Sequence, residues 1–72
     1  MGMAKEAAEQ YLEASRLYPE RAIPYYNLAV IFYENGRAAE AKAYLEKALL
    51  AEPDFKPAIE LLDRIKKTEN EL

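Results

Sequence analysis

The sequence contains no cysteine and no histidine, and its only two glycines are Gly2 and Gly36. Without cysteine the chain can form no disulfide and offers no thiolate as a nucleophile or metal ligand. Without histidine it lacks the most common general base, and neither Ser15 nor Thr68 stands in a motif with a base. Two isolated glycines cannot form a phosphate-binding loop. We therefore expect that the chain is not an enzyme and uses no cofactor.

Charge of one sign does not dominate any part of the chain. Ten Lys and Arg stand against thirteen Asp and Glu, and the net charge is −3. The basic residues are dispersed, whereas binding to phosphates depends on clustered Lys and Arg. The carboxylates lie among basic neighbours, as Asp63 does four residues before Lys67, which indicates solvated helix faces. We expect neither a nucleic-acid partner nor a metal site.

Long apolar segments are also missing. The longest, residues 22–33, is interrupted by Pro24 and Asn27 and is shorter than the roughly 20 residues that a membrane span needs. The first residues lack the apolar core of a signal peptide. We expect no membrane partner and a cytoplasmic location. We interpret residues 1–4 as an expression scar or a frayed start before a single domain over residues 5–72.

Proline, asparagine and glycine divide the chain into four segments of helical length. In chain order these residues are Pro19 and Pro24, Asn35 and Gly36, and Pro53 and Pro57. Between them Ala, Leu, Glu and Lys dominate, and these residues favour helix. The sequence therefore predicts an all-α fold with four helices, over residues 5–18, 22–34, 37–52 and 56–68.

The sequence repeats itself with a period of 34 residues. A shift of this length aligns Glu6 with Glu40, Ala7 with Ala41, Ala14 with Ala48, Pro19 with Pro53, Leu28 with Leu62 and Ile31 with Ile65. A fixed period of this size is typical of stacked helical hairpins, in which each unit covers the apolar face of the next. The period thus favours a helical array over a closed bundle.

The same period and residue pattern resemble the tetratricopeptide repeat, whose unit of 34 residues is a helix, a turn and a helix. The residues that carry the resemblance are Tyr25, Leu28, Ala29 and Phe32 in the first helix and Ala41, Leu45, Ala48 and Pro53 in and after the second. One full repeat covers residues 22–55, with half-repeats over 5–21 and 56–72. The resemblance implies antiparallel helix-turn-helix hairpins, stacked as a short right-handed superhelix of four helices.

The last half-repeat departs from the family pattern. Asp63 replaces the small residue and Lys66 replaces the aromatic residue. We interpret both changes as those of a final helix whose outer face is in water.

The resemblance also implies a non-enzymatic protein-interaction module that binds a peptide or protein on the concave face of the first-type helix. The residues expected on that face are Ile23, Tyr26, Asn27, Val30, Tyr33 and Glu34. Tyrosine suits such a surface because it offers a large contact area and a hydroxyl. The same residues are equally consistent with packing inside the domain, and Asn27 recurs in the family as a structural residue.

An alternative hypothesis follows from the order of the segments, which is second helix, first helix, second helix, first helix. The first and last segments therefore lack their hairpin partners within this chain. A second copy would supply them, either in a swapped dimer or in a head-to-tail oligomer. In this hypothesis the chain is a self-assembling repeat unit, either a natural fragment or a designed protein.

Overall fold

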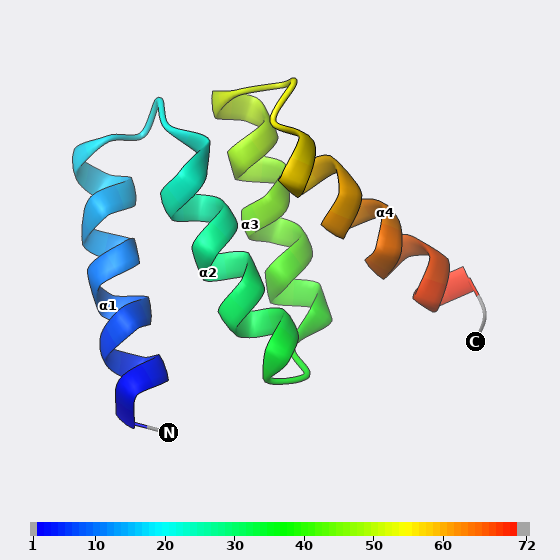
Figure 1. The fold of residues 1–72 in the computed structure, drawn as a ribbon, viewed down its shortest axis with the longest axis horizontal. Helices are drawn as coiled ribbons and strands as arrows, with labels where there is room; N and C mark the ends of the chain where they lie inside the picture. The colour runs from blue at the N-terminus through cyan, green and yellow to red at the C-terminus, as the bar shows by residue number, and fades with distance from the viewer. Residues whose placement is uncertain (1, 71–72) are drawn as a thin grey trace.

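The computed structural model describes residues 2–70 and contains four α-helices (Figure 1). They are α1 (Gly2–Leu17), α2 (Ala22–Glu34), α3 (Ala38–Ala51) and α4 (Lys56–Asn70). The all-α prediction is confirmed, and most helix ends lie within two residues of their predicted positions. The exception is α1, which begins at Gly2 instead of residue 5. Met1, part of the predicted frayed start, lies outside the described residues.

The four helices form one layer in which each helix runs antiparallel to the one before it (Figure 1). The principal contacts join α1 to α2, α2 to α3 and α3 to α4. The array is flat, with principal-axis extents of 36 × 31 × 14 Å. Each helix is therefore covered mainly by its neighbours in sequence.

The core lies where α3 packs against α2 on one side and α4 on the other. Leu45 and Ile65 are its largest fully buried side chains, and Leu28 on α2 is fully buried as well. The other fully buried hydrophobic residues are the alanines Ala22, Ala29, Ala41, Ala48 and Ala58. Small side chains at a helix contact allow the two axes to approach closely. Of the α2 stripe that carries the family resemblance, Leu28 and Ala29 are buried, whereas Tyr25 and Phe32 are half-buried. The α3 residues of the same pattern, Ala41, Leu45 and Ala48, are buried as well.

An aromatic pair also joins α2 to α3. The rings of Phe32 and Tyr44 are stacked, with centroids 5.5 Å apart and an angle of 4° between their planes. The ammonium of Lys47 lies 5.2 Å from the centroid of the Tyr44 ring, at cation–π distance. These contacts extend the hairpin interface beyond its buried alanines and leucines.

The α2–α3 turn closes the helix end with a pair of backbone hydrogen bonds. The Arg37 N–H donates to the Phe32 carbonyl at 2.9 Å, and the Gly36 N–H donates to the Tyr33 carbonyl at 3.1 Å. Gly36 has a φ of 77°, the left-handed conformation that glycine adopts most easily. This arrangement is a Schellman motif, and it explains why an Asn-Gly pair ends the second segment of the sequence.

The start of α2 is held by a residue distant in sequence. Arg21, which precedes α2, makes no side-chain capping hydrogen bond. Instead the carboxylate of Glu52 accepts a hydrogen bond of 2.8 Å from the backbone N–H of Ala22. A carboxylate at a helix N-terminus also interacts favourably with the helix dipole. Glu52 therefore fixes the end of α3 to the start of α2.

Replacing Glu52 with alanine should lower the free energy of unfolding by about 1–3 kcal/mol, because the N–H of the buried Ala22 loses its acceptor. Glu52→Gln keeps an acceptor oxygen and should cost less. Urea denaturation followed by circular dichroism measures both variants. Equal losses in the two variants would contradict a role for this hydrogen bond.

Candidate partner-binding surface

Three of the predicted binding residues form a stripe along α2. Tyr26, Val30 and Tyr33 follow one another at intervals of four and three residues, which places them on one side of the helix. All three pack against the core cluster, yet each is only half-buried. The structure thus shows that the stripe takes part in internal packing and also presents part of each side chain to solvent.

Tyr26 is supported from the α3–α4 connection. Its ring meets that of Phe55 edge-on, with centroids 5.7 Å apart and 66° between the planes. Edge-to-face contacts of this kind stabilise aromatic pairs beyond the area that they bury. Tyr26 is therefore positioned by a residue from outside its own helix.

The remaining predicted residues lie around this stripe. Ile23, one turn before Tyr26, is 52 % exposed. Asn27 is half-buried and Glu34, in the last turn of α2, is exposed. The structure thus brings Ile23 together with the stripe and places Glu34 at its far end. Binding by any of these residues stays a prediction.

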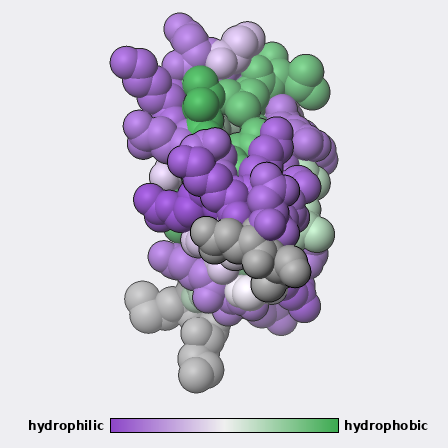
Figure 2. Space-filling view, turned by 90° about the vertical axis from the view of Figure 1, so that its right-hand side faces the viewer, coloured by the Kyte–Doolittle hydropathy of each residue, from purple (hydrophilic) through white to green (hydrophobic). Residues whose placement is uncertain are grey.

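The equivalent stripe on α4 is charged. In the 34-residue register Tyr26, Val30 and Tyr33 correspond to Glu60, Arg64 and Lys67, and these three residues are exposed. Figure 2 shows the side of the molecule that carries α4, which is hydrophilic over most of its area with hydrophobic residues gathered near one end. An apolar stripe on α2 is thus followed along the layer by a stripe of mixed charge on α4.

Exposed hydrophobic side chains gather at one edge of the layer. Among residues 4–70, the large hydrophobic residues that are exposed are Leu12, Leu17, Tyr18, Ile23, Leu50 and Ile59. All except Leu12 lie near the edge where α1 and α3 end and α2 and α4 begin (Figure 1). Sequence reasoning missed Tyr18 and Leu50, because an apolar residue at a helix end does not alter the helical period. Ile23 belongs both to this edge and to the side of α2 that carries Tyr26, Val30 and Tyr33.

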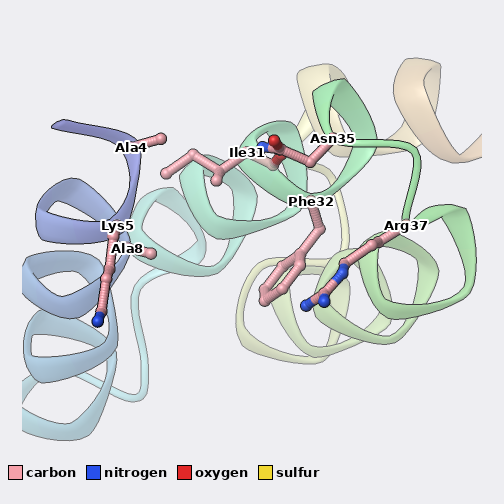
Figure 3. Close-up of a pocket in the computed structure, with 7 residues that line it drawn as sticks. All are labelled: Ala4, Lys5, Ala8, Ile31, Phe32, Asn35 and Arg37. Atoms are coloured by element: carbon pink, nitrogen blue, oxygen red, sulfur yellow. The ribbon is translucent and has the colours of Figure 1, made fainter. Parts of the chain in front are cut away.

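A cleft of about 430 Å³ lies between α1 and α2 (Figure 3). It is lined by Ala4, Lys5, Ala8, Ile31, Phe32, Asn35 and Arg37. In the 34-residue register Ala8 and Asn35 correspond to Lys42 and Glu69, whose side chains form an ion pair of 3.1 Å between α3 and α4. The shorter side chains of Ala8 and Asn35 leave the equivalent space between α1 and α2 open.

Apart from Lys42 and Glu69, the ion pairs of the described surface join residues three or four positions apart. Asp63 and Lys67 make the predicted contact on α4, at 3.2 Å, and Glu13 pairs with Arg16 on α1 at 2.7 Å. The hydrogen bond from Arg16 to the Glu13 carboxylate raises the pKa of Arg16 above its ordinary value. Within residues 2–70 no group of three or more Asp or Glu side chains is placed to hold a metal ion. Over the same residues, no helix has both the length and the apolar character to cross a membrane.

A single layer of antiparallel hairpins with a 34-residue register defines an α-helical repeat protein. The chain belongs to the tetratricopeptide repeat family. The family profile described as "Tetratricopeptide repeat" matches residues 22–55, and one described as "TPR repeat" matches residues 2–36. The first match has the bounds of the full repeat that the sequence predicts, and this resemblance is confirmed.

The chain is similar to a short segment of much longer curated proteins. The chain is 37% identical over 60 residues to the probable UDP-N-acetylglucosamine–peptide N-acetylglucosaminyltransferase SPINDLY of Petunia hybrida, and 39% identical over 56 residues to that of Eustoma exaltatum subsp. russellianum. These matches cover 83% and 78% of the chain. The chain spans about 6% of the length of either relative. No solved structure matches the chain significantly.

Proposed function

We propose that the chain binds a peptide or protein segment on the α2 surface formed by Ile23, Tyr26, Val30 and Tyr33, and that it acts by binding rather than by catalysis. The observation that carries the proposal is the half-buried stripe of Tyr26, Val30 and Tyr33, which the exposed Ile23 continues. Anchors at intervals of three and four residues along one helix are the usual way in which a helix face contacts a partner.

Burial of apolar side chains against this stripe supplies the affinity. Tyrosine has few rotatable bonds, so little conformational entropy is lost when a partner fixes its ring. The contact with Phe55 already holds the ring of Tyr26, which lowers that cost further. Asn27 and Glu34, beside and beyond the stripe, are available to hydrogen-bond the main chain of the partner.

The charged stripe of α4 indicates which residue types the partner would carry. A segment that crosses the layer from α2 to α4 passes from apolar side chains to Glu60, Arg64 and Lys67. We therefore expect the partner to combine apolar residues with charged ones of both signs. The relatives are named as enzymes that act on a peptide, and we infer that a repeat segment like this chain holds a polypeptide while the transfer takes place elsewhere.

Peptides selected from a random display library against the chain provide the probe. We expect Tyr26→Ala and Tyr33→Ala each to raise the Kd of a selected peptide by about tenfold, because buried aromatic anchors commonly contribute more than 1 kcal/mol. Fluorescence anisotropy with the labelled peptide measures the Kd, and circular dichroism checks the helix content. Tyr11→Ala, at a half-buried tyrosine on α1, is the matched control and should leave the Kd unchanged.

Two outcomes would count against this surface. An unchanged Kd in both α2 variants would place the peptide elsewhere. A loss of helix content in these variants would instead assign the two tyrosines to the core alone.

Self-association is the second candidate, and the observation that favours it is the exposure of Leu12 and Leu17 on α1, at 44% and 59%. In a head-to-tail contact, α1 of one copy would pack against α4 of another. The face of α4 is less suitable for this contact, because it carries exposed Asp63 and Lys66 where α2 has Ala29 and Phe32. Sedimentation equilibrium over a wide concentration range decides between the two candidates. A constant monomer mass excludes self-association, and a mass that grows with concentration supports it.

A further inference from the structure

The Asn35–Gly36 pair in the α2–α3 turn carries a chemistry that is separate from the proposed binding surface. We propose that Asn35 is a site of spontaneous deamidation and that the folded turn controls its rate. Water is the only co-reactant, and no enzyme is required.

The reaction begins at the Gly36 backbone nitrogen, which attacks the side-chain Cγ of Asn35. A bond forms between this nitrogen and Cγ, and the bond from Cγ to Nδ2 breaks. The departing NH2 group takes up the proton of the Gly36 amide and leaves as ammonia. The product is a cyclic imide. Water then opens it: cleavage at Cγ gives aspartate, and cleavage at the main-chain carbonyl gives isoaspartate. The overall change consumes one water and releases one ammonia.

The next residue decides which asparagine reacts. Attack on Cγ requires a close approach by the following backbone nitrogen, which a side chain on that residue obstructs. Asn27 is followed by Leu28 and Asn70 by Glu71, whereas Asn35 is followed by glycine. The space where a Gly36 side chain would stand has no other atom within 4 Å, and both residues of the pair are exposed. Asn35 is therefore the most reactive of the three asparagines.

The closed turn opposes the reaction through two hydrogen bonds. The Gly36 N–H donates to the Tyr33 carbonyl at 3.1 Å, which directs the attacking nitrogen into the turn. The Asn35 Nδ2 donates to the Ile31 carbonyl at 2.7 Å, which holds the side-chain amide against the last turn of α2. With Asn35 at φ −98° and ψ 15°, both groups are fixed in the helix cap. The turn must open before nitrogen and Cγ can meet.

Deamidation would change the turn permanently. Either product replaces the amide donor to Ile31 by a carboxylate and places a negative charge at the C-terminal end of α2, where the helix dipole disfavours it. Isoaspartate also adds a methylene to the backbone, so the hydrogen bonds of the Schellman motif no longer fit. Each opening of the turn thus gives Asn35 a chance to react irreversibly. The fraction of chains modified at Asn35 therefore increases with the time that the turn has spent open.

The test compares the three asparagines in one chain. The protein is incubated in mildly alkaline buffer, with and without a urea concentration that unfolds it, and conversion at each asparagine is followed by peptide mass spectrometry with fragmentation that separates aspartate from isoaspartate. We expect conversion at Asn35 to be at least about tenfold faster in urea than in the folded state, because local opening limits the native rate. In urea, Asn35 should also convert well ahead of Asn27 and Asn70.

The Asn35→Gln variant is the matched control, because it keeps a side-chain amide in the cap but requires a larger and less favourable ring. Its turn should show no conversion on the same timescale. Equal rates at the three asparagines in urea, or no conversion of Asn35 there, would overturn the proposed site. Equal rates for Asn35 with and without urea would overturn the control by the folded turn.

Discussion

Leu45→Ala is expected to lower the free energy of unfolding by about 2–5 kcal/mol, which is the usual cost of removing a buried leucine side chain. Leu45 is 0% exposed and is one of the largest fully buried residues in the core. The surrounding alanines have little side chain with which to fill the space. Since the stability of a small domain is only about 5–15 kcal/mol in total, this one change should remove a large part of it.

Leu50→Ala is the matched control, because it removes the same atoms from the same helix. Leu50 is 83% exposed, so its replacement should alter the free energy of unfolding by no more than about 0.5 kcal/mol. Urea denaturation of both variants, followed by circular dichroism, gives the comparison. Similar losses for the two leucines would mean that the core is not where the structure places it.

Ala29→Asp is expected to unfold the chain or to cost at least about 3 kcal/mol, because a buried carboxylate without a partner has no compensation for its lost hydration. Ala29 is 0% exposed and faces α3 in the core cluster. The 34-residue register makes this substitution informative, since the equivalent residue on α4 is already an aspartate, Asp63. The same residue type is thus placed at two equivalent positions with opposite surroundings.

The reverse change, Asp63→Ala, should be nearly neutral. Asp63 is exposed and pairs with Lys67, and such a pair on a helix surface contributes about 0.2–0.5 kcal/mol. Thermal unfolding of the two variants beside the parent chain measures the difference. If Ala29→Asp were tolerated as well as Asp63→Ala, the packing of α2 on α3 would have to be looser than described.

The fold could be predicted from the sequence because two independent signals agree. Proline and the Asn-Gly pair mark the connections, and the 34-residue period identifies which residues face a neighbouring helix. Leu28, Leu45 and Ala48, which carry the family pattern in the sequence, are fully buried in the structure. Only the start of α1 differed clearly, since the sequence from Gly2 to Ala4 holds no proline or polar cap that fixes where the helix begins.

The surface was less predictable, because it depends on distances between residues far apart in sequence. The hydrogen bond from the Ala22 N–H to Glu52 joins residues 30 positions apart, and the 34-residue pattern does not encode it. The cleft between α1 and α2 arises from the size of Ala8 and Asn35, which a helical period does not encode. The sequence did not decide whether Tyr26 packs inside the domain or faces a partner. In the structure its side chain is half-buried.

The succession of helix contacts has a consequence for how the chain folds. Because the principal contacts join helices that are consecutive in sequence, the chain has a low contact order. The α2–α3 hairpin can form first as a nucleus, and α1 and α4 can then add to it from either side without closing a long loop. Such a route needs little search through long-range pairings, so we expect this chain to fold rapidly for its size.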